Sequence, residues 1–125
     1  MKWRLKTDEI KKKIELIHET FDELQVLKQK SKDELSSIDR ELSNHYHNIE
    51  GAEIDYMSDS HMMMMKLKDI LYTRRDAKVN HTLLESFISA MERGVDKTKK
   101  RYVEILEKHE EIIQEIIDRS KENKN

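Results

Sequence analysis

The feature that most constrains this chain is a seven-residue repeat of core-type positions along most of its length. From Ile10 to Tyr56 these positions follow one another at alternating intervals of four and three residues. A repeat of 3.5 residues lines up its apolar members on one side of an α-helix and favours left-handed, coiled-coil packing. The pattern therefore predicts long helices that meet through narrow seams.

Composition agrees with this prediction. Charged residues make up 40% of the chain and hydrophobic residues 36%, with no proline and two glycines. Such a profile is typical of long helices, and the scarcity of turn residues argues against a sheet. We expect an all-α fold in a single domain, residues 1–125. Because narrow seams bury little apolar surface, we also expect a homodimer or a higher homo-oligomer.

The first helix is expected over about residues 8–56, with Gly51 tolerated inside it; the alternative is a helix stop near Glu50. Ser58, Asp59 and Ser60 are small oxygen-bearing residues that favour turns and helix starts, so we expect the chain to reverse there. A second repeat then runs from Met63 to Ile116 without a change of phase.

Gly94 leaves two architectures open. The unbroken phase predicts an antiparallel hairpin of two very long helices, whereas Arg93, Gly94 and Asp96 together resemble a helix end followed by a new start. We favour the second, a three-helix bundle with helices over about 60–93 and 96–120 and a frayed tail over 121–125.

Several function classes are not expected. The net charge is −2, from 24 basic and 26 acidic residues, which gives no general attraction to nucleic acid. No apolar run approaches the length of a membrane span, and no signal peptide is recognisable, so a cytoplasmic location is expected. There is no cysteine and no metal-ligand set with recognisable spacing, and Met62 to Met65 point around a whole helical turn. We expect no catalytic residues, no metal and no cofactor.

Polar residues interrupt the two repeats and form a predicted histidine–arginine belt. Folding the helices about residues 58–60 would bring His45 near Arg74, both at core-type positions. Buried polar groups of this kind are unfavourable unless they are paired. The belt consists of His45, Tyr46, His47, Glu50, Arg74, Arg75, Lys78 and His81.

Two interpretations of the belt stay open. In the first, Arg74 and His45 bind carboxylates and fix the register of the helices. In the second, the cations and histidines grip a phosphate while tyrosines stack on a base. We favour the first, because no glycine-rich phosphate loop accompanies the cations.

The stretches around the belt resemble small helical proteins of phages and prophages of Gram-positive bacteria. Their pattern is I-D-x-E-L…H-x-I-E followed by L-x-x-x-L-x-x-R-R-x-x-K. It is matched here by Ile38, Asp39, Glu41, Leu42, His47, Ile49 and Glu50, and then by Leu67, Leu71, Arg74, Arg75 and Lys78. The resemblance implies a phage-associated accessory or regulatory role, in the host cytoplasm.

The sequence therefore predicts a non-catalytic helical module that binds another protein, as an inhibitor or modulator of a host system. The alternative is a helical oligomer that binds a nucleotide or another phosphate ligand through the belt, as a sponge or sensor.

Overall fold

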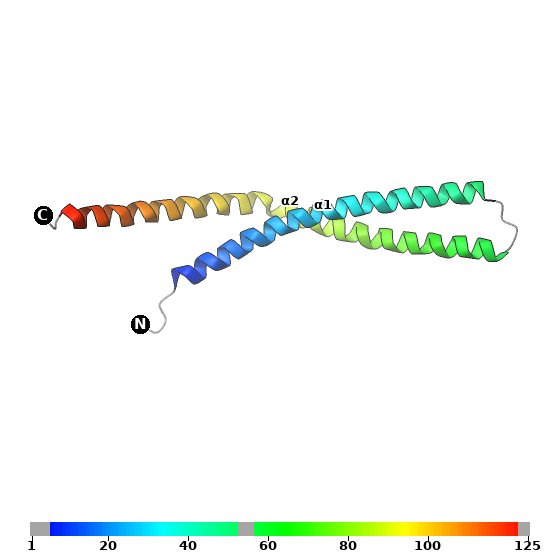
Figure 1. Cartoon of the computed structure of the whole chain (residues 1–125), viewed down its shortest axis with the longest axis horizontal. Helices are drawn as coiled ribbons and strands as arrows, with labels where there is room; N and C mark the ends of the chain where they lie inside the picture. The colour runs from blue at the N-terminus through cyan, green and yellow to red at the C-terminus, as the bar shows by residue number, and fades with distance from the viewer. Residues whose placement is uncertain (1–5, 53–56, 123–125) are drawn as a thin grey trace. The chain divides into compact units, whose positions relative to one another are not determined.

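The structure, a computed structural model, describes residues 6–52 and 57–122 and contains two α-helices over those ranges. Helix α1 spans Thr7–Gly51 and helix α2 spans Met57–Glu122 (Figure 1). The two helices pack against each other as a hairpin, so the all-α prediction and its two-helix alternative are confirmed.

The predicted break at Gly94 is wrong, and with it the three-helix arrangement. Helix α2 passes through Gly94, which has no positive φ and therefore does not form the left-handed cap that ends many helices. A glycine inside a helix costs about 1 kcal/mol relative to alanine. The apolar seam resumes at once with the buried Val95, and packing of this kind outweighs propensity. Residues 121 and 122 of the predicted tail also belong to α2.

The reversal of the chain lies earlier than predicted. Helix α1 ends at Gly51, close to the alternative stop near Glu50, and the Ala52 N–H donates to the Ile49 carbonyl at 3.3 Å. The predicted turn residues 58–60 lie in the first turn of α2. Serine and aspartate suit a first helical turn as well as a loop, because both complement its free N–H groups. Residues 53–56 of the predicted first helix lie outside the described residues.

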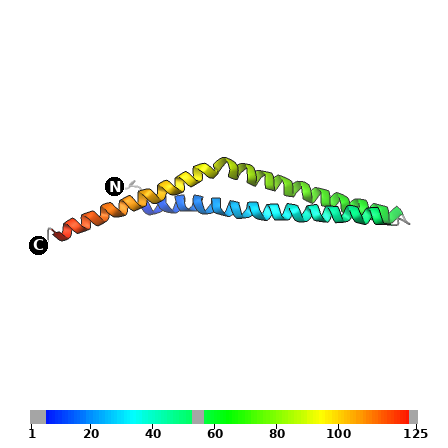
Figure 2. The ribbon, with the colours of Figure 1, turned by 90° about the horizontal axis from the view of Figure 1, so that it is seen from above.

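The chain divides into two compact units, each made of a piece of both helices. In the unit of residues 19–89, the two pieces run antiparallel and side by side (Figures 1 and 2). Its core is a cluster of Ile38, Ile70 and Ala77, against which Leu35 and Leu42 pack. Residues seven apart on each helix thus occupy successive layers, as the repeat predicts.

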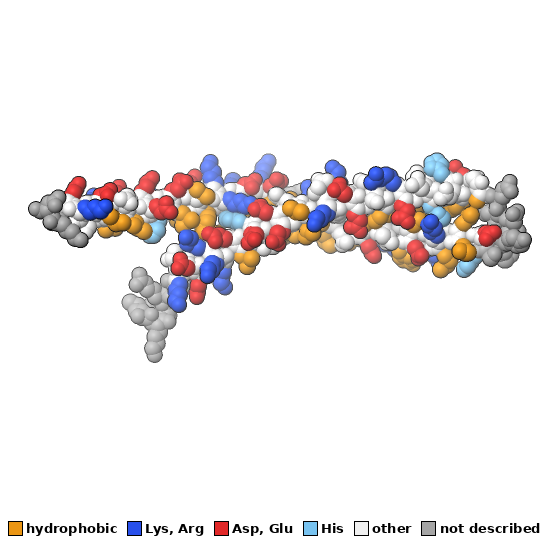
Figure 3. Space-filling view, viewed as in Figure 1, with side chains coloured by type: hydrophobic (Ala, Val, Ile, Leu, Met, Phe, Trp, Pro, Cys, Tyr) orange, Lys and Arg blue, Asp and Glu red, His pale blue; other side chains and the backbone are white. Residues whose placement is uncertain are grey.

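The other unit contains the described residues 6–18 and 90–122. Two side-chain hydrogen bonds join its helix pieces, one between His18 and Thr98 and one from Tyr102 to Glu15. On the C-terminal part of α2, hydrophobic side chains gather along one side and acidic side chains along the other (Figure 3). Within residues 6–52 and 57–122, neither helix has a stretch long and apolar enough to cross a membrane.

Candidate functional site

His45 is buried between the two helices of the hairpin and links them by a hydrogen bond. Its side chain is buried at 5% exposure, and its Nε2 lies 3.0 Å from the carbonyl oxygen of Met63 on α2. Because a carbonyl oxygen only accepts, Nε2–H of His45 is the donor. The bond ties the end of α1 to the start of α2.

Arg74 is engaged in an ion pair within the hairpin. Its Nε donates to Oδ1 of Asp39 at 2.6 Å, and both side chains are partly open to solvent. This short charge-assisted hydrogen bond uses one N–H donor of the Arg74 guanidinium and links the Arg74 side chain to α1.

The predicted contact between His45 and Arg74 is therefore wrong. His45 meets Met63, and Arg74 meets Asp39. The difference follows from the position of the turn: α1 ends at Gly51 and α2 already begins at Met57, so the chain reverses before the expected pivot at residues 58–60. In an antiparallel hairpin, a shift of the turn by a given number of residues changes the residue that faces any position by twice that number.

Of the other belt residues, only His47 and Glu50 contact each other among the described contacts. His47 pairs with Glu50 at 3.8 Å on the exposed face of α1, and His81 pairs with Glu85 at 3.3 Å along α2. Tyr46 and Lys78 are exposed. Among the contacts of the described residues, none joins these side chains into one site.

Arg75 belongs to a different surface. With Lys68, Leu71 and Tyr72 it lines a shallow hollow of about 200 Å³ on α2. The hollow has two cations beside an aromatic ring, which suits an acidic or aromatic group of a partner.

Sequence reasoning missed a second apolar face of α2, which we call the outward stripe: Tyr72, Val79, Leu83 and Phe87. These four side chains are between 51% and 64% exposed. At 3.6 residues per turn they fall within an arc of about 80°, opposite the seam residues Ile70 and Ile88. Their spacing of seven, four and four residues is visible in the sequence, but the stronger seam repeat concealed it.

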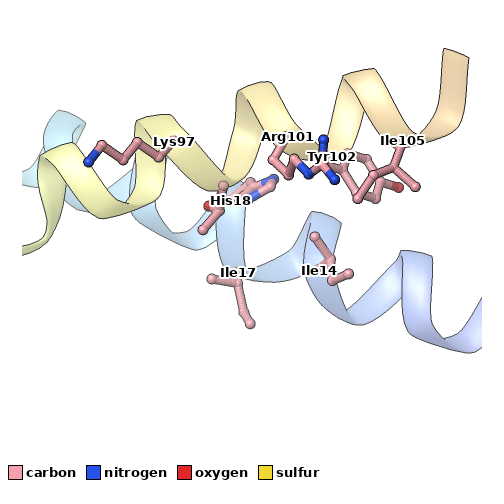
Figure 4. Close-up of a pocket in the computed structure, with 8 residues that line it drawn as sticks. Ile14, Ile17, His18, Lys97, Arg101, Tyr102 and Ile105 are labelled. Atoms are coloured by element: carbon pink, nitrogen blue, oxygen red, sulfur yellow. Dashed lines mark hydrogen bonds between the residues drawn. The ribbon is translucent and has the colours of Figure 1, made fainter. Parts of the chain in front are cut away.

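The unit of residues 6–18 and 90–122 contains a hollow of about 520 Å³, here called the isoleucine groove (Figure 4). Its lining is Ile14, Ile17 and His18 of α1 and Lys97, Thr98, Arg101, Tyr102 and Ile105 of α2. His18 and Tyr102 lie between the helices, with ring centroids 5.9 Å apart in an edge-to-face arrangement. The groove thus combines an apolar lining with two cations.

Tyr102 is held by Glu15. Its hydroxyl donates to Glu15 Oε1 at 2.7 Å. The hydrogen bond to this carboxylate, followed by burial and by the charge of Glu15, raises the pKa of Tyr102 above its ordinary value of 10.0. The contact keeps the phenol neutral and fixes the ring on the groove.

The methionine run is largely exposed. Met62, Met64 and Met65 are exposed, whereas Met63 is half-buried and lends its carbonyl to His45. Within the described residues, no group of three or more histidine, aspartate or glutamate side chains is placed to hold a metal ion.

No protein-family model, curated protein or solved structure matches this chain.

Proposed function

We propose that this chain is a non-catalytic helical module that binds another protein through the outward stripe of α2. The observation that carries the proposal is the position of the stripe: four large apolar side chains stay exposed opposite the seam that α2 uses for its own hairpin. A helix with two apolar faces can serve two neighbours at once. Exposed apolar patches of this kind mark interaction sites.

The stripe favours an amphipathic helix as the partner's binding element. Its members lie one or two turns apart, which is the spacing at which one helix presents anchors to another. Tyr72 and Phe87 are aromatic, and aromatic side chains are enriched in the cores of protein interfaces. Lys68 and Arg75 flank Tyr72, so the partner helix is expected to carry carboxylates at that end.

The resemblance to phage and prophage proteins supports a bacterial host protein as the partner, inhibited or modulated by this module. The nucleotide-binding alternative has less support, because Arg74 is paired with Asp39 and His45 with a backbone carbonyl. A thermal-shift assay with nucleotides separates the two functions, since a bound ligand raises the melting temperature by mass action.

The proposal is tested by photo-crosslinking in Gram-positive host cells. A benzophenone amino acid replaces Leu83 or Phe87 in the stripe, or Ser89, an exposed residue on another face of α2, as the matched control. We expect one host protein to be captured from Leu83 and Phe87 but not from Ser89. The additional change Val79→Asp should abolish capture while the helix content, measured by circular dichroism, is retained.

Two outcomes would contradict the proposal. One is capture of the same proteins from Ser89 as from the stripe. The other is adducts formed only between copies of the chain.

A further inference from the structure

The C-terminal part of α2 carries a wide apolar face that is open to solvent in the described structure. Ile112, Ile113, Ile116 and Ile117 are between 42% and 62% exposed. With Ile105 and His109 they fall within an arc of about 140°, wider than the stripe by which a surface helix faces one neighbour. A face this wide and apolar is expected to be covered in solution.

The charges of the same region are divided along the helix. Residues 97–101 contain four cations and no carboxylate, and two of these cations, Lys97 and Arg101, line the isoleucine groove. Residues 103–118 contain six carboxylates and one lysine. The unit therefore has a cationic apolar groove and, further along α2, an acidic segment with one apolar side (Figure 3).

This division of charge favours a second copy of the chain as the partner that covers the groove, and it favours an antiparallel arrangement of the two copies. A parallel pair of copies in register would bring the two acidic segments, with six carboxylates each, alongside one another. An antiparallel pair instead brings the acidic segment of each copy over the cationic groove of the other. Contacts of this kind repeat identically about a two-fold axis and close the assembly at two copies.

We propose that the chain forms an antiparallel homodimer in which residues 105–117 of α2 pack on the isoleucine groove and α2 of a second copy. With the two-fold axis beside Glu107, the seven-residue repeats of the two α2 helices lie in register. It pairs Tyr102 with Ile112 of the second copy and brings Arg101 alongside the second copy's Glu115. The contact uses residues separate from the outward stripe and goes beyond the proposed protein binding.

The dimer is tested by sedimentation equilibrium of the full chain, whose mass is 15.1 kDa as a monomer. We expect reversible association to twice that mass, with a dissociation constant on the order of 10 μM, as suits a small interface. The double substitution Ile112→Asp and Ile116→Asp should weaken association at least about a hundredfold, because it places charges on the apolar face. Both side chains are exposed in the single chain, so circular dichroism should show unchanged helix content.

The matched control makes the same change in charge elsewhere on α2. Arg93→Glu also makes the chain more negative by two, at an exposed position of α2 outside residues 105–117. This variant should dimerise like the unchanged chain. Equal weakening by both variants would overturn the proposal, because it would show that net charge alone controls association.

A charge swap tests the antiparallel direction. Arg101→Glu and Glu115→Arg should each weaken the dimer about tenfold at low salt, since each creates two like-charge contacts about the two-fold axis. The combined variant should restore association. A chain that stays monomeric up to about 500 μM, or a dimer insensitive to Ile112→Asp with Ile116→Asp, would overturn the proposal.

Discussion

The ring of His45 on α1 donates a hydrogen bond of 3.0 Å to the carbonyl oxygen of Met63 on α2. The bond lies inside the seam, where His45 and Ser31 are the buried polar side chains among the described residues. A directional bond at a buried position permits fewer registers than apolar contact does. His45 therefore aligns the two helices beside the turn.

Replacing His45 with alanine should destabilise the hairpin by about 2 kcal/mol, because a buried hydrogen bond is lost and a small cavity remains. Urea unfolding followed by circular dichroism measures the change. His47→Ala, at an exposed position on the same helix, should change stability by less than about 0.5 kcal/mol. Equal effects of the two substitutions would contradict the structural role of His45.

Ser31→Ala should stabilise the chain by about 1 kcal/mol. The Ser31 hydroxyl is buried with no hydrogen-bond partner among the described residues, and alanine is also the better helix former. Chemical unfolding of the two proteins side by side measures the difference. Loss of stability in the variant would show that the hydroxyl is satisfied in solution by an ordered water.

Charge reversal at Asp39 and Arg74 should reveal a coupling of about 0.5–1 kcal/mol. Arg74→Glu and Asp39→Arg each place like charges together at the 2.6 Å contact, whereas the double variant restores an opposite pair. The coupling should shrink in roughly 0.5 M salt, because both side chains are partly exposed. If Arg74→Glu left stability unchanged, the pair would not hold the register.

Tyr102 should ionise at a higher pH than an ordinary tyrosine, because its hydroxyl donates to Glu15. Its pKa is raised in the folded chain, so its contribution to stability is complete below pH 10.0 and is lost as the pH rises through the raised pKa. Ultraviolet titration measures this, with Tyr102→Phe identifying the signal. In Glu15→Gln the pKa of Tyr102 should return toward 10.0, and an unchanged titration would contradict the contact.

Gly94→Ala should raise the free energy of unfolding by about 1 kcal/mol and the melting temperature by about 4 °C. A methyl group at Gly94 meets no atom within 4 Å beyond its chain neighbours and the adjacent helix backbone, and the residue has no positive φ. Gly51→Ala is the control: it has the same open surroundings but ends α1, where helix propensity counts for less. Destabilisation by Gly94→Ala would indicate that the helix bends or breaks there in solution.

The seam was predictable from the sequence, because the buried positions of a helical hairpin recur at regular intervals along the chain. Ile38, Ile70, Ala77 and Ile88 all occupy repeat positions and are buried. The same repeat correctly predicted a helix that continues through Gly94, although the residues around Gly94 resemble a helix end. Where periodic packing and a single turn residue disagreed, the packing decided the structure.

The register and the site were less predictable. Ser58 and Asp59 suit a loop and a first helical turn equally, and that ambiguity moved the expected pivot and paired His45 with the wrong residue. The outward stripe was missed because Leu83 and Phe87 lie off the dominant repeat. A search for a second apolar direction on the same helix would have found it.

The exposure of Ile116 and Ile117 also makes the state of the chain depend on its concentration in the cell. If this face is covered only by another copy, the fraction of chains with a closed C-terminal segment depends on how much protein a cell makes. At low abundance the segment is open to proteases and to foreign apolar surfaces; at high abundance it is protected. The concentration of the chain would then regulate its own lifetime.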